Sequence, residues 1–266
     1  MEWQDNLSKM RTEHSSPVKY FLKLGEEEVL MNSLINQKIN IQFTGIINCV
    51  ACGRKIKKAF GQGFCYPCFI NSPLNSECII RPELCMAHEG KGRDPEWEEK
   101  NHNQPHIVYI ALTSEIKVGV TRTDQIPTRW IDQGAWKAIK FALTPYRQIA
   151  GLIEIHLKNH LSDKTNWQRM LKNDMDHSVD LVADKMRVSG LLSPELKEYY
   201  LPDENEIHTF EYPVSVYPEK IKSINLEKEP SFQGQLNGIR GQYLIISDNR
   251  VINLRKYSGY EIILSV

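Results

Sequence analysis

The stretches HIVYIALTSEIKVGVTR, residues 106–122, and TPYRQIAGLIEIHLKNHL, residues 144–161, decide how the middle of this chain folds. The first consists of two short apolar runs, HIVYIALTS and EIKVGVTR, which predict two successive strands. In the second, apolar residues recur at the spacing of an α-helix; they are Ile149, Leu152, Ile153, Leu157 and Leu161. The small residues beside Glu154 on this helix would let another element lie close to its carboxylate.

Polar side chains follow one another in a particular order through this region: Tyr109, Lys117, Arg129, Glu154 and Asn166. A strand ending in Tyr, a strand ending in Gly, an Arg, a Glu on a helix and an Asn resemble the GIY-YIG nuclease superfamily. The resemblance implies that Arg129 contacts the phosphate and Glu154 holds one Mg²⁺ or Mn²⁺ ion. Tyr109 would lie near the attacking water, and Asn166 would support the site. Phosphodiester hydrolysis needs this kind of charge neutralisation and metal assistance.

The chain departs from the superfamily pattern at Lys117, which stands where the second motif has a tyrosine. A lysine can contact phosphate as a point charge, but it cannot replace a phenol hydrogen-bonded to water. Each residue also has a plainer interpretation. Tyr109 could be a core aromatic, Arg129 a surface residue and Asn166 a turn residue. Either a nuclease or a nuclease fold without cleavage is therefore consistent with the sequence.

A second pattern precedes this region, Cys49-x2-Cys52-x12-Cys65-x2-Cys68. Each C-x2-C pair supplies two thiolates from one tight turn, and zinc prefers four such ligands in a tetrahedron. In a reducing compartment this spacing favours zinc over disulfides. The four cysteines therefore predict a zinc ribbon with one structural Zn²⁺.

A further set of metal ligands is weaker in its spacing: Cys78, Cys85, His88 and His102. These residues lie in an irregular segment, 71–105, which has little periodicity and would need something other than a core to hold it. We therefore expect a second zinc site here, with two small buried cysteines and a surface histidine as the alternative.

Composition limits the function classes. The chain has 266 residues, of which 41% are hydrophobic and 25% charged, with a formal net charge of zero. A strong nonspecific nucleic-acid binder would usually be basic, so binding would depend on a local patch, for which RKIKK at 54–58 is the best candidate. No apolar run approaches the ~18 residues of a membrane span, and the polar N-terminus does not read as a targeting signal. We expect a cytoplasmic protein with no membrane partner.

The whole chain is also similar to members of an uncharacterised bacterial family that joins a zinc ribbon to a GIY-YIG-like domain. The residues that carry this resemblance are CVACGRKIKKAFGQGFCYPCF, IKVGVTR, PTRWIDQGAWKA, DKTNW and GIRGQYLI. The resemblance implies four cysteines between positions 78 and 102, of which Gly92 and His102 occupy two places here. His102 could still bind zinc, whereas Gly92 could not, so His88 would have to substitute.

Together these patterns predict an α+β protein. A zinc ribbon in residues 1–105 precedes a GIY-YIG-like mixed α/β domain in 106–204, and 205–266 form a small all-β domain. The first hypothesis is a nucleic-acid-binding protein, for RNA or DNA, associated with the translation or repair machinery. The second is a Mg²⁺- or Mn²⁺-dependent endonuclease, and the third is a protein-interaction module.

Overall fold

The computed structural model describes residues 1–162 and 164–266. The chain divides into two compact units, one of Met1–Ile70 with Phe210–Val266 and the other of Asn71–Thr209. None of the helices in the described part of the chain has the length and apolarity that crossing a membrane would require.

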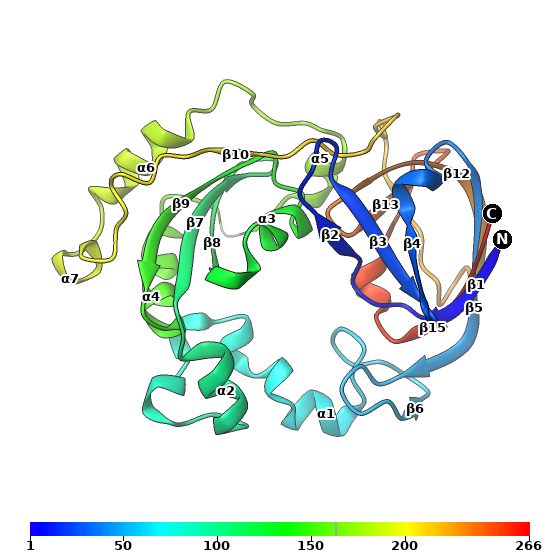
Figure 1. The fold of residues 1–266 in the computed structure, drawn as a ribbon, viewed down its shortest axis with the longest axis horizontal. Helices are drawn as coiled ribbons and strands as arrows, with labels where there is room; N and C mark the ends of the chain where they lie inside the picture. Colours follow the sequence, from blue (N-terminus) through cyan, green and yellow to red (C-terminus); the bar gives the residue numbers. More distant parts are fainter. Residues whose placement is uncertain (163) are drawn as a thin grey trace. The chain divides into compact units, whose positions relative to one another are not determined.

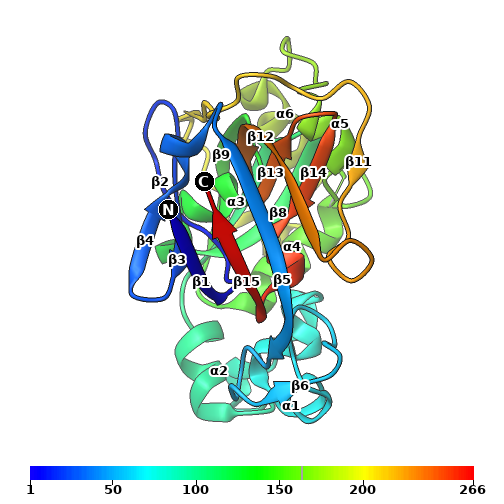
Figure 2. The ribbon, with the colours of Figure 1, turned by 90° about the vertical axis from the view of Figure 1, so that its right-hand side faces the viewer.

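The first unit is built on a large sheet whose strands come from both ends of the chain. These strands are β1 (Glu2–Asn6), β5 (Lys38–Asn48), β6 (Lys55–Ile56), β11 (Lys222–Ser223), β12 (Ser231–Arg240), β13 (Tyr243–Ile246), β14 (Arg250–Asn253) and β15 (Tyr260–Ser265). Their order in the sheet is β1-β15-β5-β12-β13-β14-β11, with β6 paired to β5. Figure 2 shows β5 between β15 and β12. The mixed α+β character with several sheets is confirmed.

A smaller sheet and short helices complete this unit. The sheet has the order β2-β3-β4, formed by β2 (Arg11–Glu13), β3 (Lys19–Leu24) and β4 (Glu27–Leu30). The 3₁₀-helices are η1 (Met31–Leu34) and η7 (Leu254–Tyr257), and α1 (Tyr66–Asn71) carries the last cysteine of the ribbon, Cys68.

The unit boundaries differ from the three predicted domains 1–105, 106–204 and 205–266. Strand β5 pairs with β12 on one side and β15 on the other, both antiparallel. The C-terminal strands therefore share a sheet with the N-terminal segment, and the ribbon extends from the end of β5.

The second unit contains the region that resembles a nuclease. Its sheet has the order β10-β9-β7-β8, formed by β7 (His106–Leu112), β8 (Ile116–Arg122), β9 (Lys137–Thr144) and β10 (His208–Thr209). Its α-helices are α2 (Pro95–His102), α3 (Thr128–Asp132), α4 (Arg147–Leu157), α5 (Trp167–Leu171), α6 (Leu181–Ser189) and α7 (Pro194–Lys197). Its 3₁₀-helices are η2 (Pro73–Asn75), η3 (Glu77–Ile79), η4 (Pro82–Leu84), η5 (Ala87–Glu89) and η6 (Thr123–Gln125).

Helices cover both faces of this sheet, and every residue of β7 is buried. Successive side chains of a strand point to opposite faces. Val108 and Ile110 therefore join the core on one side, where they pack with Ile153 of α4. Tyr109 points to the other side and meets Trp130 of α3. Figure 1 shows α3 on one side of β7 and β9, with α4 and α6 on the other.

Candidate functional site

The first candidate site is the group Cys49, Cys52, Cys65 and Cys68 of the ribbon. Their four sulfur atoms lie within 4.8 Å of one another, and the sulfurs of Cys52 and Cys65 are 3.8 Å apart. In a tetrahedral site with zinc–sulfur bonds of about 2.3 Å, neighbouring sulfurs are about 3.8 Å apart. The group therefore could hold one zinc ion, as the spacing of the cysteines predicts.

Tight turns on either side bring these cysteines together. Gly53 adopts a positive φ of 72° and donates its N–H to the carbonyl of Cys49 at 2.8 Å, a conformation that glycine adopts at little cost. The N–H of Cys65 donates to the sulfur of Cys49 at 3.1 Å. Burial opposes ionisation of Cys49, but the N–H groups around it outweigh burial and lower its pKa to about 6. The turn thus favours the thiolate that zinc binds.

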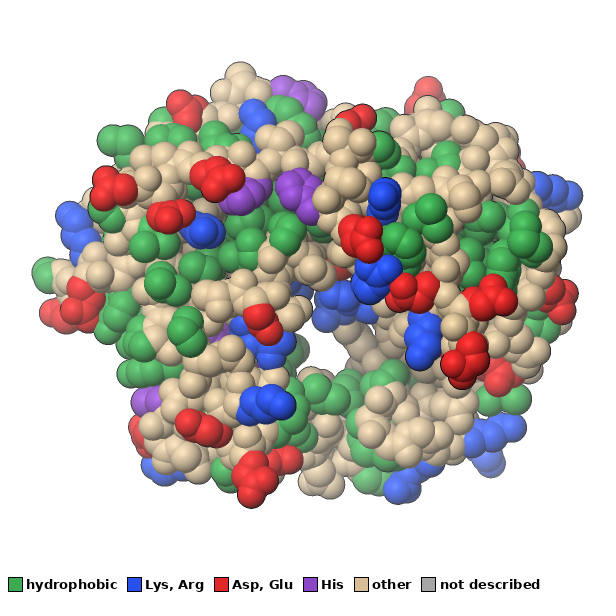
Figure 3. Space-filling view, in the orientation of Figure 1, with side chains coloured by type: hydrophobic (Ala, Val, Ile, Leu, Met, Phe, Trp, Pro, Cys, Tyr) green, Lys and Arg blue, Asp and Glu red, His purple; other side chains and the backbone are tan. Residues whose placement is uncertain are grey.

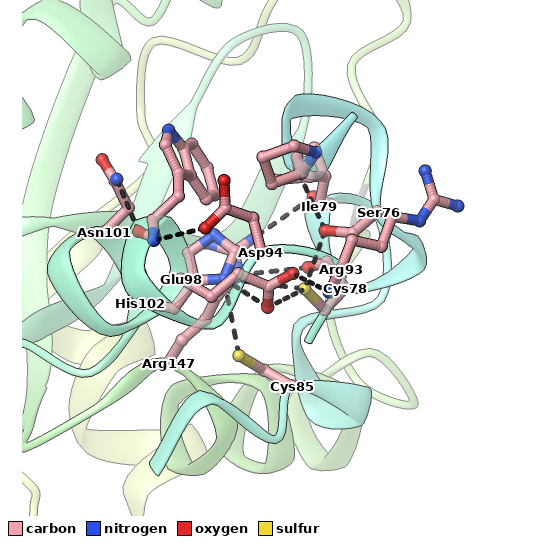
Figure 4. A network of polar contacts seen from close by, with 12 residues as sticks. Ser76, Cys78, Ile79, Cys85, Arg93, Asp94, Glu98, Asn101, His102 and Arg147 are labelled. Carbon is pink, nitrogen blue, oxygen red and sulfur yellow. Dashed lines mark hydrogen bonds and ion pairs between the residues drawn. The ribbon is translucent and has the colours of Figure 1, made fainter. Parts of the chain in front are cut away.

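The second candidate site is the group Cys78, Cys85, Glu98 and His102, whose ligand atoms also lie within 4.8 Å of one another. Cys78 lies within η3 and Cys85 directly follows η4, whereas Glu98 and His102 stand one turn apart on α2. Figure 4 shows the four side chains converging. All four are buried, so this group also could bind zinc.

The predicted ligand His88 is not part of this group. Its ring stacks on Tyr146 with centroids 4.4 Å apart, and its Nε2 lies 3.8 Å from a carboxylate oxygen of Glu89. Sequence reasoning missed Glu98, although its spacing of four residues from His102 on a helix was a usable signal.

The third candidate site surrounds Tyr109, whose side chain is 1% exposed. Its ring meets Trp130 edge to face, with centroids 5.9 Å apart. Its hydroxyl accepts a hydrogen bond from Nε2 of Gln133, a partner that sequence reasoning also missed. Burial raises the pKa of Tyr109 above its usual value of 10, so the phenol stays protonated at neutral pH.

Two of the predicted site residues change the pKa of this phenol. Arg129 lowers the pKa of Tyr109 and Glu154 raises it, although burial has the larger effect. The structure thus brings Tyr109, Arg129 and Glu154, here called the Tyr109 cluster, within electrostatic range of one another. Glu154 also lies 4.0 Å from the ammonium of Lys158.

The other two predicted residues have different surroundings. Lys117 shares the sheet face of Tyr109, but it is only 6% exposed and donates from Nζ to the hydroxyl of Thr165 at 3.2 Å. Asn166 is exposed and caps α5, where its side chain accepts from the N–H of Arg169 at 3.2 Å. Asn166 therefore has the local role that its plainer interpretation as a turn residue suggests.

Comparisons with known proteins give a family and no function. The family described as "Protein of unknown function (DUF2797)" matches residues 36–262, a span that includes all three candidate sites. No curated protein and no solved structure matches the chain. Because the match covers most of the sequence, the chain belongs to the DUF2797 family.

Proposed function

We propose that this protein binds RNA or DNA through its zinc ribbon, and that phosphodiester cleavage at the Tyr109 cluster is weak or absent. The observation that carries the proposal is an exposed basic loop next to an exposed aromatic side chain on the ribbon. Lys55, Lys57 and Lys58 are all exposed, and Tyr66 is 59% exposed. Grooves for single-stranded nucleic acid combine such cations with aromatic platforms.

The ribbon keeps a positive charge after its metal site is counted. Residues 49–70 contain four basic residues and no Asp or Glu, and four thiolates around one Zn²⁺ would offset two of those four charges. The ribbon would therefore be a local basic surface despite the net charge of zero. Arg54 is also exposed, and its interaction with the sulfur of Cys52 raises the pKa of Arg54. We expect the three lysines to contact phosphate. On the face in Figure 3, acidic and basic side chains are otherwise interspersed.

Tyr66 belongs to a small aromatic group that holds it in place. Its ring meets Phe60 edge to face at 5.3 Å, and Phe60 lies 6.1 Å from Phe69. The ammonium of Lys58 lies 5.9 Å from the centre of the Phe60 ring. A base stacked on Tyr66 would therefore place its phosphate beside this loop, an arrangement that stabilises binding by roughly 1–3 kcal/mol per base.

The proposal is tested by binding of labelled single- and double-stranded RNA and DNA at several salt concentrations. Neutralising three phosphate contacts changes the salt slope for a single strand by about 2. The triple variant Lys55→Ala, Lys57→Ala, Lys58→Ala should lose that much slope, and Tyr66→Ala should weaken binding roughly tenfold or more while Tyr66→Phe binds normally.

A matched control removes the same charge elsewhere in the same unit. Lys220, Lys222 and Lys228 are also exposed, and their triple alanine variant should bind as the wild type does. Equal losses in both triple variants would contradict a site on the ribbon. Absence of any salt-sensitive binding by the wild type would make protein interaction the leading hypothesis.

A metal-dependent endonuclease of the GIY-YIG type is the second candidate, and the Tyr109 cluster favours it. There Arg129 would neutralise the phosphate, and Glu154 would hold a Mg²⁺ or Mn²⁺ ion. The elements that carry the cluster, β7, α3 and α4, also follow the order on which the resemblance rests. Two observations favour binding instead: Lys117 donates to Thr165, and the phenol of Tyr109 is buried and protonated.

The variant Glu154→Gln separates these two candidates. In an endonuclease the carboxylate holds the cation, so the variant should lose Mg²⁺- or Mn²⁺-dependent cleavage and keep most of its binding. In a binding protein the variant should show unchanged or higher affinity, with no cleavage in the wild type either. Metal-dependent cleavage by the wild type that Glu154→Gln abolishes would establish the enzyme.

A further inference from the structure

We propose that Glu98 is the fourth ligand of a second zinc centre, formed with Cys78, Cys85 and His102, and that Arg147 balances the charge of this centre. The proposal does not depend on nucleic-acid binding. It changes the ligand set that the sequence predicts, because a carboxylate takes the place of His88.

The distances between the four ligand atoms agree with a tetrahedral zinc site. Nδ1 of His102 lies 3.7 Å from the sulfur of Cys78 and 3.6 Å from that of Cys85. Oε2 of Glu98 lies 3.5 Å from the same nitrogen and 3.9 Å from the sulfur of Cys78. For zinc bonds to sulfur, nitrogen and oxygen, the edges of the tetrahedron are about 3.3–3.8 Å long.

The two oxygens of Glu98 have separate partners, as in a carboxylate that binds zinc through one oxygen. Oε1 accepts a hydrogen bond from the backbone N–H of Arg93 at 3.0 Å, which leaves Oε2 facing the sulfur and the imidazole. Hydrogen bonds of this kind orient a ligand toward its metal. Helix α2 begins at the Asp94 cap and presents Glu98 and His102 on one face, because residues four apart are neighbours on a helix.

Gly92 makes room for this carboxylate. A Cβ atom at residue 92 would lie 2.4 Å from the carboxyl carbon of Glu98 and 2.6 Å from Oε2, distances that no side chain could tolerate without moving Glu98. The absence of a side chain at this position therefore lets Glu98 reach the two cysteines.

The charges of the group support a bound cation. Glu98 and Cys85 are at most 2% exposed, and His102 is 3% exposed. Two thiolates and a carboxylate carry three negative charges, which repel one another and are costly to bury without a partner. One Zn²⁺ leaves a single negative charge on the centre.

Arg147 is placed to compensate that remaining charge. Its guanidinium donates to the carbonyls of Cys78 and Ile79 at 3.0 and 3.1 Å, which places its positive charge beside the cysteine segment. Because these bonds also tie α4 to the cysteine segment, the centre links the irregular connector to the helix that carries Glu154.

The test is the zinc content of the full, reduced chain, measured by elemental analysis together with competition against a chromophoric chelator. The wild type should contain two zinc ions. Glu98→Gln keeps the shape and the Arg93 contact but removes the charged ligand, so it should weaken one site by more than about 100-fold, beyond the usual effect of an outer-shell change. His88→Ala, the matched control, should retain both ions.

Further variants keep the proposal falsifiable if one substitution disturbs folding. Adding Gly92→Cys to Glu98→Ala places a thiol where the carboxylate lay. The zinc content should therefore be one ion per chain in Glu98→Ala and two in the double variant. Arg147→Gln should weaken the same site roughly tenfold, and Arg147→Lys should weaken it less. A wild-type count of one overturns the proposal, as does a Glu98→Gln variant that keeps both affinities or a His88→Ala variant that loses one ion.

Discussion

At the scale of single residues, Gly119 determines where Tyr109 can lie. The two residues pair directly across β7 and β8, and a Cβ at residue 119 would fall 2.5 Å from the hydroxyl of Tyr109. We predict that Gly119→Ala lowers the free energy of unfolding by about 1–3 kcal/mol, the usual cost of overpacking a core. Urea denaturation monitored by circular dichroism measures this change.

A double-mutant cycle shows whether the tyrosine ring is the cause. In a Tyr109→Leu background the ring is absent, so Gly119→Ala should cost less than it does in the wild type, with a coupling of 0.5 kcal/mol or more. Additive effects of the two substitutions would mean that the glycine is needed for another reason.

The role of Asn166 as the cap of α5 can be tested separately from its predicted role in the nuclease-like site. Its side chain accepts from the N–H of Arg169 at the start of α5, and loss of such a cap costs about 1 kcal/mol. Asn166→Ala should therefore lower the melting temperature slightly, and Asn166→Asp should preserve it. Nucleic-acid affinity should be the same in both variants. A change in affinity without a change in stability would indicate that Asn166 belongs to the predicted nucleic-acid site.

At the scale of elements, the packing of η4 on α4 depends on Gly151. A Cβ at this position would lie 2.2 Å from the backbone nitrogen of Glu83. Alanine is intrinsically favoured in a helix by about 1 kcal/mol, but here the backbone of η4 would have to move. We predict a net loss of about 1–3 kcal/mol in the free energy of unfolding of Gly151→Ala.

Gly190 provides the matched control, because it follows α6 and a Cβ there would make only an ordinary contact, 3.5 Å from the carbonyl of Arg187. Gly190→Ala should leave stability within about 0.5 kcal/mol of the wild type, as expected for a surface substitution. Equal stability of the two variants in thermal denaturation would contradict the close packing of α4 with η4.

At the scale of the whole molecule, the two units differ in how they depend on the ends of the chain. Unit Asn71–Thr209 is continuous and contains its own sheet, its own core and the second cysteine group. We predict that a fragment of residues 71–209 folds alone, unfolds cooperatively and binds one zinc ion, as measured by circular dichroism and elemental analysis.

The opposite result is expected for a fragment of residues 1–204. This fragment lacks β12 and β15, which pair with both edges of β5, so its first unit should be digested rapidly by protease. Protection of residues 1–70 in that fragment would show instead that the N-terminal segment folds without the C-terminal strands.

The sequence by itself determined the features that depend on local spacing. The two C-x2-C pairs of the ribbon bring their four sulfurs within 4.8 Å of one another, the apolar periodicity of α4 places Ile153 and Leu157 in the core, and alternation places Tyr109 opposite Val108 on β7. These patterns are readable because a turn, a helix and a strand each have a fixed period along the chain.

Tertiary structure alone decided what depends on contacts between distant segments. Gly234 and Gly238 lie in β12, where Ile246 and Val214 respectively approach them too closely for a side chain. Likewise, β5 finds its partners about 200 residues away, and Glu98 rather than His88 meets the cysteines. No periodicity along the chain encodes such pairings, because they are selected by the packing of the folded chain as a whole.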